Sequence, residues 1–275
     1  MIEKTIHYIW LSGERKDYHA WRCIRSWKRH MKDFRIREWH MEDFDWDAMP
    51  AYVREALEMR KWAFVSDYLR LYILYHHGGI YMDSDVRVKD SLEQFMDHRF
   101  FSAMELHTDQ SDPDLVDSQG QALTDGKIPG ICLQAAIMGS EPGHPFLKDC
   151  MDYYQEAHFT ISSETAAEIP IAPDIYATKA RKYGFRYLNQ EQHLDKDMAI
   201  YPSNIIASSP WRLYPESVAV HMCAGSWRYW SLTYKIRIGL VKYYHLWETG
   251  FILRWIPFRG AARRMRETLK GKNES

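Results

Sequence analysis

Within the first forty residues, the hydrophobic pattern changes from that of a strand to that of a helix and back again. Residues 5–10 (TIHYIW) form an apolar run that predicts a buried strand, and residues 34–39 alternate as a second strand does. Between them, four apolar residues at helical spacing predict a helix over 20–31: Trp21, Ile24, Trp27 and Met31. A strand, a helix and a strand this close in sequence form a βαβ unit, which predicts a parallel sheet.

The α/β pattern continues along the chain. A long helical stretch over 51–77, broken once, ends at Gly78 and Gly79, and a strand over 80–88 follows. Residues 107–130 are polar and rich in turn formers, which predicts a long surface loop or lid. Further predicted elements are a strand over 133–140, helices over 144–157 and 173–184, and short extended segments at 199–208 and 217–227. We therefore expect a mostly parallel central sheet flanked by helices.

Composition narrows the class of protein. The chain has 275 residues, 46% of them hydrophobic and 27% charged, as in a globular domain. The formal net charge of -1 offers no global basic field for nucleic acid. The four cysteines form no C-x-x-C pair. The N-terminus lacks the apolar core of a signal peptide, and no stretch of 18 apolar residues occurs, so we expect a cytoplasmic protein.

The sequence Asp83-x-Asp85 is the first candidate for chemistry. The spacing occurs five times in the chain, and by spacing alone each pair is typical of a solvated turn. Only Asp83 and Asp85 follow an apolar strand of the predicted parallel sheet, where ligands bind beyond the carboxyl ends of the strands. On one continuous strand over 80–88 the two carboxylates would share a face with Tyr81 and Arg87. Oxygen ligands of this kind suit Mg²⁺ or Mn²⁺.

The preceding helix carries a second polar pair, Asp67 and Arg70. Residues three apart lie on one helical face, and these two stand among apolar neighbours, so both need partners. Two interpretations stay open from the residues alone. The pair can be a mutual ion pair that holds the helix, or it can belong to the same site as the two aspartates.

The block SDYLRLYILYHHGGIYMDSDV resembles the core motif of glycosyltransferases with the GT-A fold and a D-x-D motif. It is most similar to the family 32 type, which includes bacterial capsular-polysaccharide glycosyltransferases, yeast-type initiating mannosyltransferases and, more distantly, clostridial glucosylating toxins. The segments IHYIWLSG, RSWKRHMKDFRIREWHMEDFD, AIMGSEPGHPF and AVHMCAGSW resemble other blocks of that group. The resemblance implies a GT-A domain over residues 1–232, Rossmann-like, with a helical C-terminal extension over 233–275.

The resemblance also implies roles for single residues. Asp85 would bind a divalent cation, Mn²⁺ or Mg²⁺, which bridges the phosphates of a nucleotide-sugar. Asp83 would contact the sugar or ribose and assist the metal, and Arg70 and Asp67 would hold the sugar hydroxyls, so these four residues would form the catalytic group. His221 would be a C-terminal metal or phosphate ligand. Further donor-binding residues would be Trp10, stacked on the base, with Tyr81, Gln134, Ser226 and Trp227.

For Trp10 and His221 a purely structural role is equally consistent with the sequence. Relatives often have Asn near Ala135, so either Gln134 replaces that amide or the donor pocket differs. The resemblance implies retention of anomeric configuration, a UDP-sugar or GDP-mannose as donor, and a saccharide or lipid-linked saccharide as acceptor, in bacterial surface polysaccharide or glycolipid synthesis. The aromatic and basic segment 233–275 would suit contact with the inner face of the cell membrane, or a packed helix with a solvated basic end.

Three other classes of protein fit the sequence less well. A phosphatase with a nucleophilic aspartate is disfavoured, because that class expects Thr or Val where Arg87 stands, on the first strand rather than the third. A non-catalytic carbohydrate-binding protein, or a degenerate nucleotide-sugar-binding one, would explain the aromatic content of 15% but would not need Asp67, Arg70, Asp83 and Asp85 together. Nucleic-acid binding would rest only on the basic tail.

Overall fold

A computed structural model of the chain describes residues 1–107, 110–159 and 170–223. The predicted βαβ unit opens the fold: β1 (Thr5–Ile9), α1 (Tyr18–His30) and β2 (Arg35–Trp39). β1 and β2 pair in parallel, as expected, with Thr5 opposite Arg35. The helix α1 begins after Asp17, whose carboxylate accepts a hydrogen bond from the Ala20 amide at 2.8 Å, as an N-cap residue does.

The predicted long helical stretch is two helices, α2 (Ala51–Glu58) and α3 (Trp62–His77), which confirms the single break. α3 ends at Gly78, whose amide donates to the Leu74 carbonyl, and Gly78 and Gly79 both have positive φ angles, 66° and 89°. A Cβ on Gly79 would lie 2.6 Å from the Thr5 carbonyl oxygen. The two glycines therefore let the chain leave the helix and enter the sheet beside β1 without a spacer.

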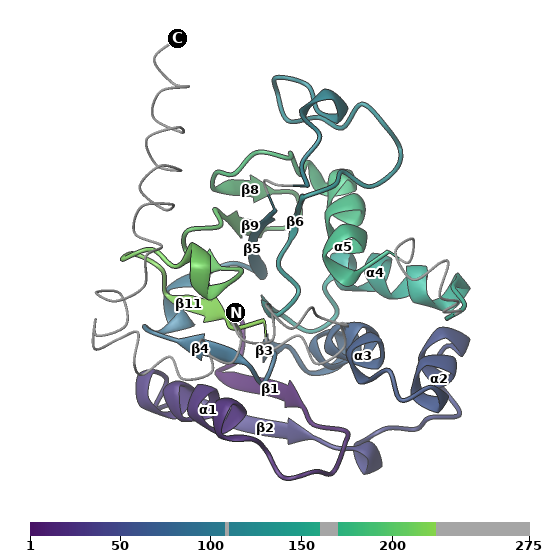
Figure 1. The fold of residues 1–275 in the computed structure, drawn as a ribbon, viewed down its shortest axis with the longest axis vertical. Helices are drawn as coiled ribbons and strands as arrows, with labels where there is room; N and C mark the ends of the chain where they lie inside the picture. The colour runs from purple at the N-terminus through teal and green to yellow at the C-terminus, as the bar shows by residue number, and fades with distance from the viewer. Residues whose placement is uncertain (108–109, 160–169, 224–275) are drawn as a thin grey trace, which may run out of the picture. The chain divides into compact units, whose positions relative to one another are not determined.

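The main sheet has the order β2-β1-β3-β7-β5-β9-β8, and β6 pairs with the C-terminal part of β5, off this path. Figure 1 shows most of these strands. Along this path only β7 and β8 run against the others, so the expected mostly parallel α/β sheet is confirmed. A second sheet of three strands has the order β10-β11-β4. The strands are β3 (Gly79–Met82), β4 (Val86–Val88), β5 (Phe100–Leu106), β6 (Ile131–Leu133), β7 (Ile137–Ser140), β8 (Gln192–Leu194), β9 (Met198–Tyr201), β10 (Ile206–Ala207) and β11 (Ala219–His221).

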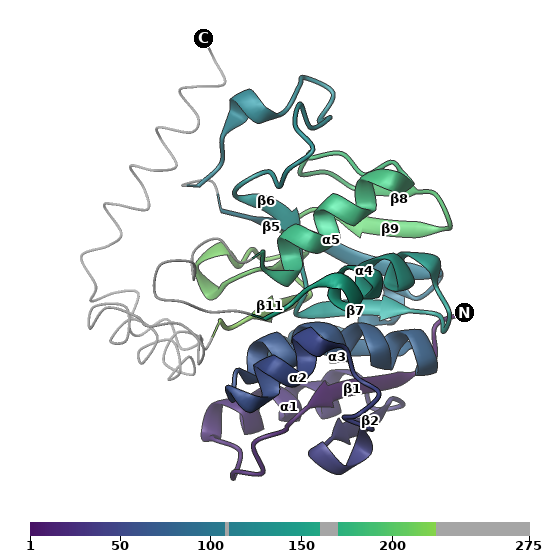
Figure 2. The same ribbon diagram turned by 90° about the vertical axis from the view of Figure 1, so that its right-hand side faces the viewer.

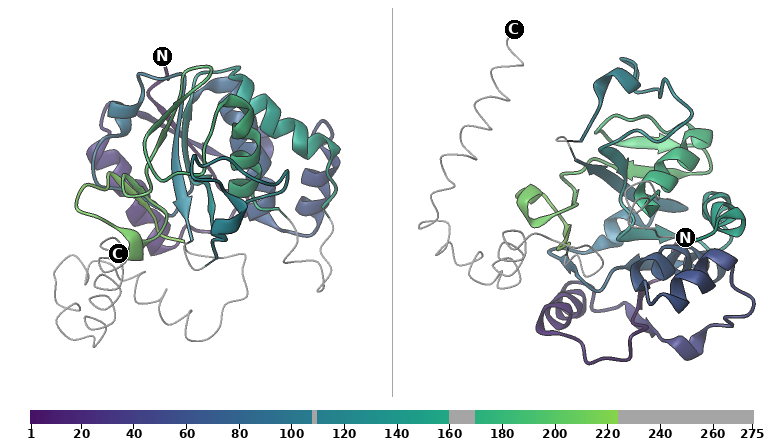
Figure 3. Two further views of the ribbon diagram at one scale, coloured as in Figure 1. Left: turned by 90° about the horizontal axis from the view of Figure 1, so that it is seen from above. Right: turned by 45° about the vertical axis from the view of Figure 1, so that its right-hand side comes forward.

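Helices cover both faces of the main sheet. α2, α3, α4 (Pro145–Glu156) and α5 (Ala172–Ala180) contribute to one apolar core, whereas Ile24 and Trp27 of α1 belong to a second core on the opposite face. Figure 2 shows α4 and α5 side by side, and the left view of Figure 3 shows α1, in purple, across the sheet from them. Short 3-10 helices complete the fold at Met41–Asp43, Leu92–Phe95, Pro113–Leu115, Arg181–Tyr183 and Pro210–Arg212.

Two predicted strands are each divided in the structure. The expected strand over 80–88 is β3 and β4, joined by a turn at 83–85, because β4 leaves the main sheet to pair with β11. The expected strand over 133–140 is β6 and β7, which pair with different parts of β5. The apolar residues of each run are buried on both sides of its break, so hydrophobicity gave no sign of the change of partner.

The remaining predictions are confirmed with shifted ends or fall outside the described residues. The loop over 107–130 holds one 3-10 turn and an isolated bridge between Val116 and Ala122. The described residues all belong to one compact unit, Met1–Trp227, so the boundary at 232 and the tail stay predictions. None of the helices in the described ranges has the length and hydrophobicity that a transmembrane span needs.

Candidate functional site

The turn between β3 and β4 carries the two aspartates. The Val86 amide donates to the Asp83 carbonyl at 2.9 Å, and the Asp83 amide donates to the Ala136 carbonyl of the neighbouring connection. The prediction that the carboxylates share one face of a continuous strand is wrong, because the chain turns where it passes from one sheet to the other. The turn, rather than strand alternation, brings the carboxylates together.

The strand β11 brings His221 to this turn from 136 residues further along the chain. β11 runs antiparallel to β4 with His221 opposite Val86, and the amide of Met222 donates to the Asp85 carbonyl at 3.0 Å. His221 Nε2 lies 3.3 Å from Asp85 Oδ1 and 4.0 Å from Asp83 Oδ2. One ligand atom from each of the three residues falls within 4.8 Å of the others, and in the described part of the chain this is the only such group of three.

This group fits a divalent cation by its donor chemistry. Two carboxylates this close repel each other unless a positive charge lies between them. Burial alone would lower the pKa of His221, but the adjacent Cys223 thiol and Asp85 carboxylate raise it well above the ordinary histidine value. A protonated His221 ring would supply a positive charge at this place, and a bound metal ion would supply it instead of that proton. Carboxylates suit Mg²⁺ and Mn²⁺, and the imidazole nitrogen favours the transition metal of the two.

Arg70 links the metal-binding group to α3. Its Nη2 lies 3.1 Å from Asp67 Oδ1 and 3.4 Å from Asp83 Oδ1, and its Nη1 donates to the Ala135 carbonyl at 3.0 Å. Nε and Nη2 also bond to the carbonyl and hydroxyl of Ser66. Both interpretations of the Asp67–Arg70 pair therefore hold in part, because the two form an ion pair and the same guanidinium also contacts Asp83.

The Asp67 carboxyl sits in a poor environment for a negative charge. Burial raises its pKa to about 7, although the adjacent Arg70 opposes the shift and Asp83 reinforces it. Tyr81 is also buried, and its hydroxyl donates to Asp83 Oδ1 at 2.7 Å. Arg70 and Tyr81 thus both contact Oδ1 of Asp83, and Oδ2 is the oxygen nearer His221. This arrangement fixes the orientation of the Asp83 carboxylate.

Gln134 and Ala135 lie in the β6–β7 connection beside Arg70. Gln134 is fully buried, and its Oε1 accepts a hydrogen bond from the Ala136 amide at 3.3 Å. Its Nε2 has no hydrogen-bond partner among the described residues, which is costly for a buried amide. The carbonyl of Ala135 is the acceptor for Arg70. A role of Gln134 in donor binding stays a prediction.

Trp10 lies beyond the end of β1, at the same edge of the sheet as the aspartates. Its indole donates to the Glu14 carbonyl at 2.7 Å, and the Lys16 ammonium lies 5.2 Å from its ring centroid. The half-buried ring packs against the apolar core that α1 covers, so both the structural role and base stacking stay open as predictions. Ser226 and Trp227 lie outside the described residues.

Cys223 is a neighbour of the metal-binding group that the sequence did not single out. Its thiol donates to the Ser208 carbonyl at 3.0 Å, and its sulfur lies 3.6 Å from His221 Nδ1. The residue has a positive φ of 48°, which is uncommon for a residue other than glycine. Its contact at Nδ1 leaves Nε2 to face the carboxylates. In the sequence, the only indication of this contact was that Cys223 stands two residues after His221.

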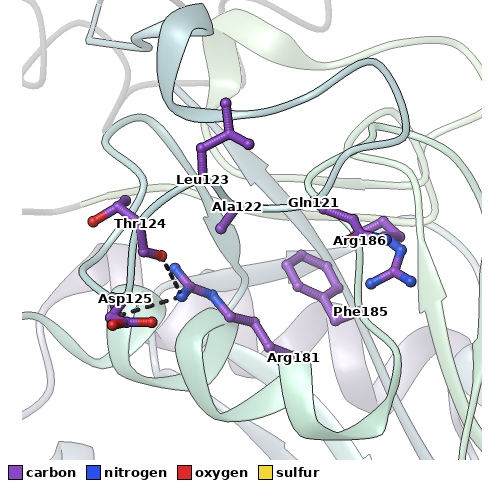
Figure 4. Close-up of a pocket in the computed structure, with 8 residues that line it drawn as sticks. All are labelled: Gln121, Ala122, Leu123, Thr124, Asp125, Arg181, Phe185 and Arg186. Carbon is purple, nitrogen blue, oxygen red and sulfur yellow. Dashed lines mark hydrogen bonds between the residues drawn. The ribbon is translucent and has the colours of Figure 1, made fainter.

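A pocket of about 530 Å³ lies elsewhere, between the loop 121–125 and the segment that follows α5 (Figure 4). Arg181 closes one wall by donating to the Thr124 and Asp125 carbonyls, at 2.8 and 3.3 Å, and Phe185 and Arg186 line it further. The residues that line it include none from the group at Asp83, so this pocket is separate from the candidate metal site.

Comparison with known proteins supports a glycosyltransferase. Residues 18–102, which contain Asp67, Arg70, Asp83 and Asp85, match the family model described as a glycosyltransferase sugar-binding region containing a DXD motif. An uncharacterized glycosyltransferase of Acanthamoeba polyphaga mimivirus is 31% identical over 111 residues, which are 37% of this chain and 42% of that protein. The chain thus spans about two fifths of the length of this curated relative.

Among solved structures, similarity in fold is weak. A glycosyltransferase involved in glycosylation of the major capsid of PBCV-1 has a TM-score of 0.43 at 11% identity, over 86% of this chain and 98% of its own. The galactosyltransferase LgtC, solved with donor and acceptor sugar analogues, has a TM-score of 0.41 at 14% identity, over 86% and 95%. The glycosyltransferase PaToxG has a TM-score of 0.42 at 14% identity, over 66% and 69%.

Proposed function

We propose that this protein is a metal-dependent glycosyltransferase of the GT-A type. It moves a sugar from a nucleotide-sugar, with a UDP-sugar as first choice and GDP-mannose as second, to a saccharide or lipid-linked saccharide acceptor. The observation that carries the proposal is the convergence of Asp83, Asp85 and His221 within 4.8 Å, with Arg70 contacting Asp83. The donor, the retention of configuration and a bacterial surface-polysaccharide or glycolipid pathway rest on the resemblance alone.

The roles of the residues follow from their contacts. Asp83, Asp85 and His221 would hold Mn²⁺ or Mg²⁺, which stabilises the diphosphate as it leaves. Arg70 and Tyr81 orient Asp83 through its Oδ1, and Arg70 adds a fixed positive charge beside the place where negative charge develops. Asp67 balances that charge on the side of α3. We assign no protein nucleophile.

The first test measures thermal stability with UDP-, GDP- and CMP-sugars, each with and without Mn²⁺. A nucleotide-sugar at about 100 times its dissociation constant adds about 2.7 kcal/mol to the free energy of unfolding. We expect one nucleotide class to stabilise the wild type only with Mn²⁺, and Asp85→Asn to abolish the shift. The matched control is Asp45→Asn, at an exposed Asp-x-Asp pair, which should keep the full shift.

Turnover then separates an enzyme from a binding protein. Release of nucleoside diphosphate from the stabilising donor, in the presence of saccharide acceptors or with water alone, is expected from the wild type and not from Asp85→Asn. Stabilisation without any release would identify a degenerate nucleotide-sugar-binding protein. If no nucleotide-sugar stabilises the wild type with Mn²⁺, the proposed donor site is wrong.

A further inference from the structure

The outer face of α1 combines exposed aromatic and basic side chains. Tyr18 and Trp21 are 59% and 49% exposed, and their rings stack with centroids 6.2 Å apart at an interplanar angle of 18°. The Arg22 guanidinium lies 5.7 Å from the centroid of the Tyr18 ring, and that of Arg25 lies 5.1 Å from the centroid of Trp21. The aromatic rings and the cations therefore form one continuous surface rather than isolated side chains.

Charge is strongly segregated at this helix. Residues 15–32 contain seven Lys or Arg and one Asp, in a chain whose formal net charge is -1. Within α1 itself the charged side chains are Arg22, Arg25, Lys28 and Arg29, with no acidic residue among them. Arg25, Lys28 and Arg29 are exposed. A surface of this kind is complementary to a dense negative charge.

The buried face of α1 packs against β4, the strand that directly follows the turn with Asp83 and Asp85. The Trp27 indole donates to the Val86 carbonyl at 2.8 Å, and the Ser26 hydroxyl accepts from the Val88 amide at 3.0 Å. α1 follows the carboxyl end of β1 and runs back along the sheet, so its first turn lies at the edge where β3 ends. Tyr18 and Trp21 therefore lie near the edge of the sheet that carries Asp83 and Asp85.

We propose that the outer face of α1 docks on the surface of an anionic phospholipid bilayer. Tyr and Trp settle at the level of the lipid headgroups, and Lys and Arg on the same helix contact anionic headgroups. The chain's own C-terminal segment, 233–275, does not complement this face, because it carries ten Lys or Arg against three Glu. Docking of α1 would bring the edge of the sheet with Asp83 and Asp85 to the membrane surface.

Vesicle sedimentation with the full chain tests the proposal. We expect binding to vesicles of phosphatidylcholine mixed with phosphatidylglycerol, weak binding to phosphatidylcholine alone, and a loss of binding as ionic strength rises. Each Lys or Arg near an anionic surface contributes about 1 kcal/mol, so Arg25→Gln/Lys28→Gln should weaken binding about 30-fold. The control Arg54→Gln/Lys148→Gln removes the same charge from α2 and α4, on the other face of the sheet, and should bind as the wild type does.

A second measurement tests the aromatic pair. Brominated lipids in the vesicles should quench part of the tryptophan fluorescence of the wild type, and Trp21→Ala should lose that part. The proposal is wrong if the wild type does not bind anionic vesicles, or if the two double variants bind them equally well. It is also wrong if duplex nucleic acid displaces the protein from vesicles at a lower concentration than free competing lipid does.

This inference does not rest on the proposed function. The α1 variants should keep the stabilisation by nucleotide-sugar and Mn²⁺, because Trp21, Arg25 and Lys28 are exposed side chains on the outer face of α1. Vesicle binding without donor binding would refute the proposed function alone, and donor binding without vesicle binding would refute the membrane surface alone.

Discussion

His7 gives a pH dependence of stability that can be worked out from its surroundings. The ring lies in the middle of β1 and is 1% exposed, and the Trp39 indole donates to its Nδ1 at 3.1 Å. An indole N–H can only donate, so Nδ1 must be unprotonated and the ring neutral. Burial lowers the pKa of His7 to about 3, and the positive charges of His77, Arg37 and Arg35 add to that shift.

The sign of the effect follows from proton linkage. With a pKa of about 3 in the folded protein and about 6.5 in the unfolded chain, His7 binds a proton only in the unfolded chain between these values. Its contribution to stability is therefore complete above pH 6.5 and is lost as the pH falls. At about 1.36 kcal/mol per pH unit below pH 6.5, the loss between pH 7.5 and pH 4.5 is about 2.7 kcal/mol. That is a large fraction of the ~5–15 kcal/mol that stabilises a typical domain.

Denaturant unfolding at pH 7.5 and pH 4.5 measures this loss. His7→Asn keeps an acceptor near the position of Nδ1 and cannot be protonated, so it should lose about 2.7 kcal/mol less than the wild type between the two pH values. His76→Asn makes the same change at an exposed position of α3 and should behave as the wild type does. If His7→Asn and the wild type lose stability equally, to within about 0.5 kcal/mol, the buried neutral histidine is not the cause.

Three further substitutions test the surroundings of the metal-binding group. Arg70→Met leaves two carboxylates without their cation and should destabilise the metal-free protein by about 3–5 kcal/mol in denaturant unfolding; a loss below that of an ordinary surface change would contradict the buried ion pair. Gly79→Ala should destabilise by about 1–3 kcal/mol, because its Cβ meets a β1 carbonyl, whereas Gly143→Ala has a positive φ but nothing within 4 Å and should cost less. Cys223→Ala should weaken Mn²⁺ binding about 10-fold in calorimetry by freeing the His221 ring, and unchanged affinity would show that the thiol does not orient it.

Much of the fold could be predicted from the sequence where the signal is local. The apolar spacing of α1 and the alternation of β2 predicted the parallel βαβ unit. Side chains share a face when they are three or four residues apart in a helix and two residues apart in a strand, so both patterns can be seen within a short segment. The glycines at 78 and 79 ended α3 for an equally local reason, since their positive φ angles suit no other residue as well. The spacing of Asp67 and Arg70 likewise fixed them on one helical face.

The arrangement of the candidate site depended on pairing between distant segments. The run over 80–88 has the hydrophobicity of one strand, and only the pairing of β4 with β11 forces the turn that places Asp83 beside Asp85. Ala135 illustrates the same limit, because its backbone carbonyl rather than its side chain binds Arg70. Backbone acceptors of this kind leave no trace in residue identity.

The sequence by itself determined the helices, the parallel order of the first strands, and the pairs Asp67/Arg70 and Asp83/Asp85. Each of these is set by residues close together in the chain. Only the tertiary structure decided that His221 completes the group at Asp83 and Asp85, because register between β4 and β11 is fixed by assembly of the second sheet. The same holds for the outer face of α1. Its pattern of Trp and Arg is written in the sequence, but its exposure depends on which side of the helix packs against β4.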